Sequence, residues 1–287
     1  MSISIIIVTY NNQHQIKACI NSIVEEIHQI EGEIIIIDNN STDQTIKEID
    51  TLNLSKRILK PIYNKNNKGY ARANNQGISI ARNKTIFFLN PDTFLSKGTL
   101  SILMNRLTVS NKLAAIAPQL LYPNGSIQPS CRRFPTHSLL FYELFGLSKF
   151  KCIKGWKMND FNHIKECVVE QPMGAALMIK LDILRQLNGF DENFPMFFND
   201  VDICRRIYLL GKEILFYPIV VVTHEKGASI KQKQFKMIIS SQLSFLKYFL
   251  KHFPQPKYFL LNIIVMVLLL FNFPIRILTQ YLKIKIN

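Results

Sequence analysis

The chain has 287 residues, of which 48% are hydrophobic and 19% charged, a composition that suits a large folded core and excludes intrinsic disorder. Its net charge of +15 predicts an acidic partner, which composition leaves open between nucleic acid, anionic lipid and a phosphorylated small molecule. The five cysteines are scattered without a Cys-x-x-Cys pair, which argues against a disulfide framework or a zinc site and suits reduced thiols in the cytoplasm.

The first fifty residues alternate apolar runs with amphipathic segments. Ser4–Thr9 is too short for a signal peptide and, like Glu33–Ile37, too continuously apolar for a strand with one exposed face. Both runs are therefore predicted to be parallel strands covered on both sides. Apolar residues recur at a helical period over Ile16–Ile27, and a second helix is expected at Gln44–Asp50. This order predicts a doubly wound α/β fold, with a Rossmann-like, mostly parallel central sheet and helices on both faces.

Polar residues follow the ends of the first two strands. Thr9, Tyr10 and Asn11 come where the first strand ends, and Asp38 closes the second. At such a position Asp38 can accept hydrogen bonds from a nucleotide base or a ribose. Capping of its own loop is the alternative, and the local sequence favours neither.

A third strand near Leu59–Tyr63 is followed by a polar turn and a helix rich in small residues. Asn67 and Gly69 lie in the turn, and the small residues would let the helix pack closely on the sheet. The N-terminus of this helix is expected to face the ligand edge, where its N–H groups and the charge of Arg72 would attract an anion.

The run Ile86–Leu89 reads as a short buried strand that stops at Asn90-Pro91, so Asp92 is held at a strand's end. Ligands bind at the carboxyl ends of strands in α/β sheets, and a carboxylate oxygen there suits Mg²⁺ or Mn²⁺ bridging to phosphates. His224 directly follows a later strand and is a candidate second ligand of that ion. Taken alone, the sequence around Asp92 is also typical of a turn.

The second half of the chain holds a second acidic centre. Arg132 and Arg133 are adjacent and can clamp a diphosphate, although an exposed basic turn has the same sequence. Gly174 lies in a strand entered through small residues, where backbone can approach a substrate.

Asp200 and Asp202 are predicted in the first turn of a helix, which would lower the pKa of both carboxylates. A plain capped helix is the alternative. Further helices are expected near 97–109 and 182–187, and further strands near 113–118, 170–179 and 214–222.

Only one of the two carboxylates can face an acceptor, because side chains two apart on a helix point about 200° apart. Asp202 is better placed to pair with Arg206 at i+4, which would be a structural role. We also expect Asp202 to be among the residues that bind substrate. Asp200 is left as the candidate base.

In chain order these segments resemble the family 2 inverting glycosyltransferases of the GT-A fold, and within them the rhamnosyltransferase-like branch. The resemblance runs from about Ser4 to Tyr248. The segments that carry it are Val8–Asn11, Asp38–Asp43, Asn67–Gly77, Asn90–Asp92, Ser130–Pro135, Gly174–Ala176, Phe198–Asp202 with Arg206, and His224–Ser229.

The resemblance implies roles for named residues. Asp200 would be the catalytic base, and Asp92 with His224 would hold Mg²⁺ or Mn²⁺. The family usually has Glu before the base, where this chain has Asn199, so a neighbouring negative charge is missing. The residues expected to bind the nucleotide and substrate are Thr9, Tyr10, Asn11, Asp38, Asn67, Gly69, Arg72, Asn90, Arg132, Arg133, Gly174 and Asp202.

The implied activity is transfer of one sugar from a nucleotide diphosphate-sugar, a dTDP- or UDP-sugar such as dTDP-rhamnose, with inversion, in cell-surface polysaccharide assembly. The acceptor would be a hydroxyl of a glycan or of a polyprenyl diphosphate-linked sugar. The Gln-x-x-Arg-Trp signature of processive synthases is absent, which predicts one sugar per encounter. The alternative is a catalytically silent, membrane-bound glycan-binding or scaffolding member of the same fold. Nucleic acid is not expected as a partner, because the aromatic residues are not interleaved with Lys and Arg.

We expect two domains, a glycosyltransferase domain at 1–230 and a basic, hydrophobic helical tail at 231–287. Tyr258–Ile275 has no charged residue, but its length as a helix is roughly 27 Å, which is borderline for a membrane span. A re-entrant or interfacial segment on an anionic membrane surface is expected first, a single span second and a buried core helix third. The chain would then lie at the cytoplasmic face of the cell membrane.

Overall fold

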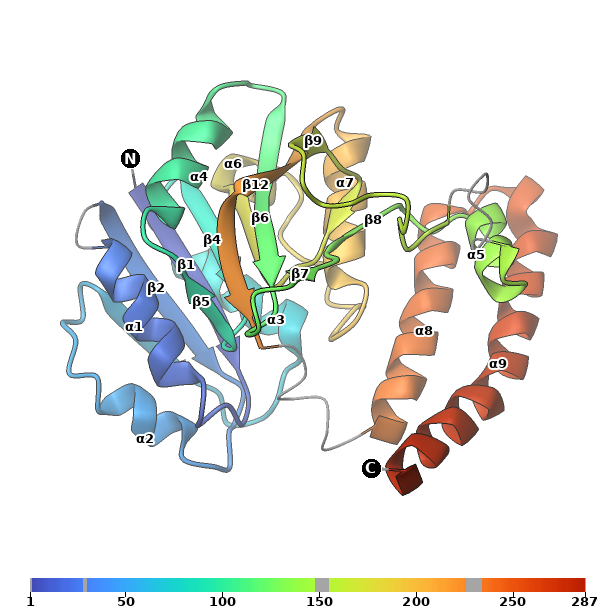
Figure 1. Cartoon of the computed structure of the whole chain (residues 1–287), viewed down its shortest axis with the longest axis horizontal. Helices are drawn as coiled ribbons and strands as arrows, with labels where there is room; N and C mark the ends of the chain where they lie inside the picture. Colours follow the sequence, from blue (N-terminus) through green and yellow to red (C-terminus); the bar gives the residue numbers. More distant parts are fainter. Residues whose placement is uncertain (1, 28–29, 148–154, 226–233, 287) are drawn as a thin grey trace.

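The computed structural model describes residues 2–27, 30–147, 155–225 and 234–286. Figure 1 shows a central sheet between layers of helices, with two long helices, α8 and α9, on the side away from α1 and α2. The strands are β1 (Ser2–Thr9), β2 (Glu31–Asp38), β3 (Leu59–Tyr63), β4 (Thr85–Leu89), β5 (Thr93–Leu95), β6 (Leu113–Leu121), β7 (Ile127–Gln128), β8 (Cys131–Arg132), β9 (Cys167–Val168), β10 (Gln171–Pro172), β11 (Ala176–Lys180) and β12 (Glu213–His224). The helices are α1 (Ile16–Ile27), α2 (Thr45–Asp50), α3 (Tyr70–Ile80), α4 (Thr99–Thr108), α5 (His137–Leu144), α6 (Leu181–Gln186), α7 (Asn199–Leu209), α8 (Gln234–His252), the 3₁₀ turn η2 (Pro256–Tyr258) and α9 (Phe259–Ile286).

The main sheet has the strand order β3-β2-β1-β4-β11-β6-β12-β5, and its first four strands are parallel. β11 runs antiparallel to β4 and β6, and β5 runs antiparallel to β12. The predicted α/β fold with a mostly parallel sheet is confirmed. Because β11 is reversed, its first residues meet the carboxyl ends of β1, β2 and β4 at one edge of the sheet.

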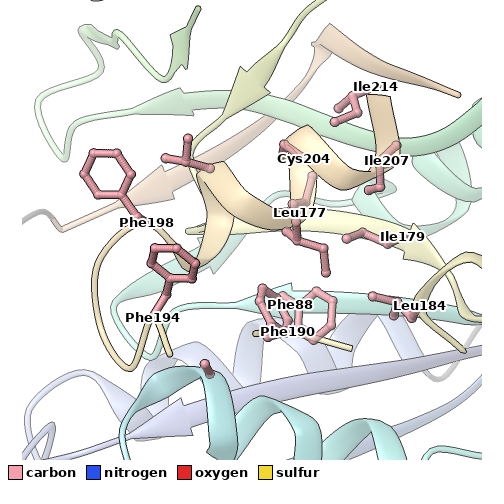
Figure 2. Packing of buried hydrophobic residues seen from close by; sticks show 14 of the residues in the cluster. Phe88, Leu177, Ile179, Leu184, Phe190, Phe194, Phe198, Cys204, Ile207 and Ile214 are labelled. Atoms are coloured by element: carbon pink, nitrogen blue, oxygen red, sulfur yellow. The ribbon is translucent and has the colours of Figure 1, made fainter. Parts of the chain in front are cut away.

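Alternate residues of each central strand enter different cores, as expected for strands covered on both sides. In β1, Ile6 and Val8 belong to the core beneath α3, α6 and α7, whereas Ile5 and Ile7 belong to the core beneath α1 and α4. Figure 2 shows the first of these cores between α7 and the sheet. α3 packs directly on the sheet because a Cβ at Gly77 would lie 2.7 Å from Ile6 Cγ2.

Several elements differ from the sequence-based expectation. β5 follows Asp92 before α4 begins, and β7, β8 and β9 were not predicted. The strand expected near 170–179 is divided into β10 and β11 by residues 173–175, which leave the ladder next to the site. β5, β8 and β9 pair with strands far away in the chain, and β7 is a two-residue strand that forms a hairpin with β6, so no local periodicity marks any of them.

The C-terminal helices are not one uniform tail. In α8, Phe245, Tyr248 and Phe249 are buried in the same core as α7, so this helix is packed into the α/β domain. In α9, Val265 is buried, while Leu260 and Phe271 are 71% and 72% exposed. A buried core helix, the third alternative for this segment, is therefore wrong.

Within the described residues, no helix combines the length and the apolar character needed to cross a membrane. Asn262, which interrupts the apolar run of α9, points into the protein. Its Nδ2 donates to Phe253 O at 3.0 Å, and its Oδ1 lies 2.9 Å from His137 Nε2. The side chains of the basic residues that follow, at 276–285, lie outside the described part of the chain.

Candidate active site

The loops after β1 and β2 are fastened to each other by side chains of the first motif. Thr9 is buried, and its Oγ1 donates to Asn12 Oδ1 at 3.1 Å, which also accepts from Tyr10 N at 3.1 Å. Asn11 has a left-handed backbone, φ 55°, and its Oδ1 accepts from Thr42 N at 2.8 Å. The two loops therefore form one ordered surface at the ligand edge.

Asp38 is a loop cap. Its carboxylate is fully buried and accepts from Ser41 N at 2.9 Å and from the Ser41 hydroxyl. Of the two roles that the sequence left open, the structure shows this one, and a contact with nucleotide stays a prediction. Asp43, in the same loop, accepts from Thr45 N at 3.0 Å and so fixes the start of α2.

The turn before α3 is ordered, but the helix N-terminus is already occupied. Asn67 Oδ1 accepts from Gly69 N at 3.0 Å, and Gly69 has φ 81°. The carbonyl oxygen of Pro195 accepts from Tyr70 N, and a Cβ at Gly69 would lie 2.8 Å from that oxygen. The prediction that the N–H groups of this N-terminus bind an anion is therefore wrong, because Pro195 O already accepts from them. Arg72 is exposed and pairs with Glu192 at 3.6 Å.

Asp92 and His224 meet at the expected edge, although 132 positions separate them in the chain. His224 Nε2 lies 3.4 Å from Asp92 Oδ1 and 3.5 Å from Asn90 Nδ2. Asn90 N donates to Ala175 O at 2.9 Å, which ties this turn to the residue before β11. Both Asp92 and His224 are buried, at the boundary between the sheet and the ligand edge.

A divalent cation fits this pair. His224 Nδ1 lies 2.7 Å from Gln128 Oε1, which can only accept, so the Nδ1 atom carries the proton and Nε2 keeps its lone pair toward Asp92. The 3.4 Å between His224 Nε2 and Asp92 Oδ1 is short enough for both atoms to bind one cation. Among the described residues, no group of three or more His, Cys, Asp or Glu side chains can hold a metal. Further ligands would have to come from substrate phosphates or water.

Asp200 is the second acidic group at the edge. Its Oδ2 accepts from Gly174 N at 3.2 Å and from Gln171 Nε2 at 3.3 Å, and its Oδ1 accepts from Val201 N at 2.9 Å. The side chain packs directly on Gly174, where a Cβ would lie 3.1 Å from the Cβ of Asp200. A side chain at position 174 would therefore press on Asp200 and displace it by a few tenths of an ångström.

The pKa of Asp200 is raised, contrary to the expectation of a lowered value. Desolvation by burial raises it, and this outweighs the lowering by hydrogen bonds from Gly174 and Val201 and by the charge of Arg132. A carboxylate with a raised pKa is a stronger base than an ordinary exposed aspartate.

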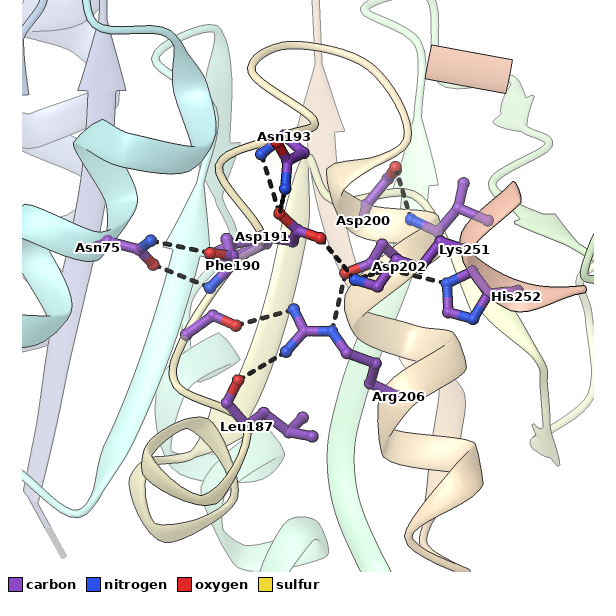
Figure 3. Close-up of polar contacts among 12 residues, drawn as sticks. Asn75, Leu187, Phe190, Asp191, Asn193, Asp200, Asp202, Arg206, Lys251 and His252 are labelled. Carbon is purple, nitrogen blue, oxygen red and sulfur yellow. Dashed lines mark hydrogen bonds and ion pairs between the residues drawn. The ribbon is translucent and has the colours of Figure 1, made fainter. Parts of the chain in front are cut away.

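Asp202 has the structural role expected from its spacing to Arg206. It is fully buried; its Oδ2 accepts from Arg206 Nε at 2.8 Å, and its Oδ1 from Lys251 Nζ at 2.6 Å and His252 Nε2 at 2.8 Å (Figure 3). Burial raises its pKa, but the His252 hydrogen bond and the charges of Arg206 and Lys251 outweigh burial and lower it. The expectation that Asp202 also binds substrate is wrong, because its carboxylate is buried among these groups.

The two arginines have different surroundings. Arg133 binds both carboxylate oxygens of Asp160, at 2.7 and 2.6 Å, and the Gly155 carbonyl oxygen at 2.9 Å. Arg132 lies over the ring of Trp156 at 5.6 Å, and its guanidinium forms no hydrogen bond or ion pair with other residues that the structure describes. A clamp made by the adjacent pair is therefore not supported, because Arg133 is already bound to Asp160.

Sequence reasoning missed four residues at this edge: Tyr70, Gln128, Trp156 and Gln171. Tyr70 is aimed between the two acidic groups, with its OH 3.4 Å from Gly174 O. Desolvation raises the pKa of this phenol, and the charges of Asp200 and Asp92 raise it further. Tyr70 lies inside a motif that was noticed, but the other three give no signal in the sequence, because their contacts are long-range.

Proteins with similar sequences include two rhamnosyltransferases. The chain is 25% identical over 212 residues to the N-acetylglucosaminyl-diphospho-decaprenol L-rhamnosyltransferase of Mycobacterium tuberculosis, a match covering 68% of this chain and 67% of the relative. It is 24% identical over 192 residues to the rhamnosyltransferase WbbL of Escherichia coli, covering 62% of this chain and 70% of the relative.

A solved structure supports the fold. The mannosyltransferase PcManGT from Pyrobaculum calidifontis, in complex with GDP-Man and Mn²⁺, matches with a TM-score of 0.60 at 17% identity, covering 93% of this chain and 69% of that one. At this identity the likeness shows the fold alone, and it agrees with the expected GT-A architecture. Residues 4–154, more than half of the chain, match the family described as Glycosyl transferase family 2. The chain therefore belongs to glycosyl transferase family 2.

Proposed function

We propose that this chain transfers a single sugar, with inversion, from a nucleotide diphosphate-sugar to a hydroxyl of a glycan or lipid-linked acceptor. The observation that carries the proposal is the placement of Asp200 and of the Asp92–His224 pair on either side of residues 174–175. Gly174 N donates to Asp200, and the next residue, Ala175, accepts from Asn90. With a sugar bound between them, the Asp92–His224 pair could act on the leaving diphosphate and Asp200 on the attacking hydroxyl.

The donor half would use the loops after β1, β2 and β4. Asp92 and His224 would hold Mg²⁺ or Mn²⁺, whose chemistry when bound is to neutralise charge on the leaving diphosphate. The ordered loops that Thr9, Asn11 and Asp38 hold in place would lie against the nucleotide. The Mn²⁺ in the PcManGT complex supports a divalent cation in this fold and does not choose between Mg²⁺ and Mn²⁺ here.

The acceptor half would use Asp200 as general base. Its carboxylate would take the proton of the acceptor hydroxyl as that oxygen attacks the anomeric carbon and the nucleotide diphosphate leaves in line, so that one displacement inverts the centre. Asn199 does not disturb this arrangement, because its side chain is buried and donates to Met196 O at 2.7 Å.

Arg132 is a candidate group for the acceptor. Its guanidinium forms no ion pair within the described part of the chain, stacks on Trp156, and is close enough to Asp200 to lower the pKa of that carboxyl. A guanidinium beside the base that is not paired with a carboxylate of the described residues suits the diphosphate of a polyprenyl-linked sugar. The name of the Mycobacterium tuberculosis relative, an N-acetylglucosaminyl-diphospho-decaprenol L-rhamnosyltransferase, supports this acceptor class and transfer of rhamnose. We propose dTDP-rhamnose as the donor to test first.

An anionic membrane surface is proposed as a partner of the C-terminal helices, at the cytoplasmic face of the cell membrane. Exposed apolar side chains cover neighbouring parts of α5, α8 and α9: Phe141, Phe145, Leu243, Leu250, Phe259, Leu260, Ile264, Leu270 and Phe271. This set, on a chain with a net charge of +15, suits an interfacial position on anionic lipid.

Vesicle flotation tests the membrane proposal. The full chain should float with phosphatidylglycerol-containing vesicles, and a Leu260→Gln, Phe271→Gln double variant should float at least several-fold less. Val109→Gln is a matched control, because Val109 is 72% exposed and lies at the end of α4. Equal flotation of all three proteins would exclude this surface.

The transfer reaction is tested with a panel of dTDP- and UDP-sugars, Mn²⁺ or Mg²⁺, and acceptors that include polyprenyl diphosphate-linked N-acetylglucosamine. Acceptor-dependent release of the nucleotide diphosphate is expected, with an inverted anomeric configuration in the product by NMR. Binding of nucleotide or glycan without release under any pairing would favour the silent scaffolding member instead.

A further inference from the structure

The first turn of α7, which carries the proposed base, begins from an unfavourable backbone. Phe198 has φ 65° and ψ 4°, a left-handed conformation that a bulky side chain adopts only when its surroundings fix it. The Phe198 ring is held by aromatic neighbours: its centroid lies 4.8 Å from that of Phe245, 5.6 Å from that of Tyr248 and 6.4 Å from that of Trp156. Two of these three neighbours belong to α8.

α8 also holds the other side of the same turn. Lys251 and His252 bind one oxygen of Asp202, which lies two residues after Asp200 and is fully buried. Figure 3 shows these side chains of α8 meeting Asp202, with Arg206 on its other oxygen. Asp200 therefore lies between two anchors on α7, Phe198 and Asp202, and both are held by α8.

The segment that leads into α7 is tied to α8 as well. Lys251 Nζ donates to Asp191 Oδ2 at 2.7 Å. Lys247 Nζ reaches only a backbone oxygen, Asn193 O, at 3.2 Å on the exposed surface, and holds neither Phe198 nor Asp202. The carbonyl oxygen of Pro195 in this segment caps α3. Movement of α8 would consequently shift the whole run from Asp191 to the base.

We propose that α8 is a positioning element of the active site. Lys251 and His252, through Asp202, and Phe245 and Tyr248, through Phe198, set the direction of the Asp200 carboxylate toward the acceptor. This inference rests on the proposed function of Asp200. All four act on Asp200 only through Asp202 or Phe198, so each is proposed as a positioning residue rather than a catalytic one.

The test compares Lys251→Met with Lys247→Met in the full chain. The two lysines lie one turn apart on the same helix, and only Lys251 binds Asp202. Lys251→Met should lower kcat roughly 10- to 100-fold, because a small misplacement of a catalytic group costs about that much. KM for the donor and metal-dependent nucleotide affinity should change less than about twofold. Lys247→Met should keep kcat within about twofold, and Lys251→Arg should recover most of the loss.

A purely structural role of Lys251 would lower the melting temperature and leave kcat per folded molecule unchanged well below that temperature, and this result would overturn the proposal. An equal loss in Lys247→Met would also overturn it, because the Asp202 contact would then not be the cause.

A second readout does not need the reaction. Trp156 is the only tryptophan in the chain and stacks beside Phe198, so its emission reports on the start of α7. Phe198→Gly permits the left-handed backbone and removes the ring held by α8. Emission should change in Phe198→Gly and Lys251→Met and stay unchanged in Lys247→Met. Unchanged emission in Lys251→Met would refute the link between α8 and this turn. Failure of the wild-type chain to transfer any sugar would instead refute the proposed function.

Discussion

The loops after β1 and β2 and the first turn of α7 both present polar side chains at one edge of the sheet, but they are held differently. The loops are fastened by partners within about one βαβ unit, such as Asn11 with Thr42 and Asp38 with Ser41. The turn of α7 is fastened by partners far away in the chain, with Lys251 and His252 49 and 50 positions beyond Asp202. The loops after β1 and β2 are therefore a local unit, and the first turn of α7 depends on α8.

The strongest test of this difference separates the two carboxylates of α7. Asp200→Asn keeps the shape of the side chain and removes the proton acceptor, so turnover should fall roughly 10²- to 10⁴-fold with donor binding little changed. Asp202→Asn should mainly lower stability, on the order of 3 kcal/mol by urea unfolding, because Arg206 and Lys251 lose the buried carboxylate with which they pair.

Any effect of Asp202→Asn on turnover should stay at or below roughly 100-fold, as for Lys251→Met. The assignment of the base fails if Asp200→Asn turns over normally while Asp202→Asn, still folded by circular dichroism, is inactive.

On the donor side, Asp92→Asn should weaken metal-dependent nucleotide binding about 10- to 100-fold in calorimetric titrations, because it removes the only carboxylate of the proposed pair. Asp43→Asn is the control, since Asp43 lies at the same edge but caps α2. Its loss should be less than about threefold. Equal losses in the two variants, or binding of nucleotide without any need for metal, would remove Asp92 from the site.

Gln128 tests the proposed metal site from a distant part of the chain, because its side chain contacts His224. Gln128→Met removes the acceptor for His224 Nδ1–H and frees the ring to rotate or change tautomer. Metal affinity should fall about 10-fold, measured by Mn²⁺ titration followed by electron paramagnetic resonance. An unchanged affinity would mean that His224 is not a ligand.

The smallest expected effect is on pH dependence. Desolvation by burial raises the pKa of Asp200 above its ordinary value of 3.8, so turnover should fall as the pH drops through a value above 3.8. The charge of Arg132 lowers this pKa, and Arg132→Gln should therefore move the acidic limb of the kcat profile to higher pH. A shift to lower pH, or none, would separate Arg132 from the base.

The partners and pKa values of the residues around Asp200 could not be predicted from the sequence, because they depend on contacts between distant segments. The i+4 spacing was enough to pair Asp202 with Arg206, yet Lys251 and His252 reach the same carboxylate only through the packing of α8. The helix-terminus rule predicted a lowered pKa for both aspartates, but burial outweighs it at Asp200 and the cations of α7 and α8 support it at Asp202. Likewise, adjacent Arg132 and Arg133 look equivalent in the sequence, and only the position of Asp160 distinguishes them.

The sequence by itself determined the α/β alternation, the parallel strands and the edge where Asp38, Asp92 and Asp200 gather. Hydrophobic period and turn residues are local, and parallel strands bring their carboxyl ends together whatever the rest of the chain does. Tertiary structure alone decided which carboxylate faces the edge, which nitrogen of His224 is left for a metal, and that α8 belongs to the core. Those outcomes depend on burial and on contacts between residues tens of positions apart, for which a single sequence has no periodic signal.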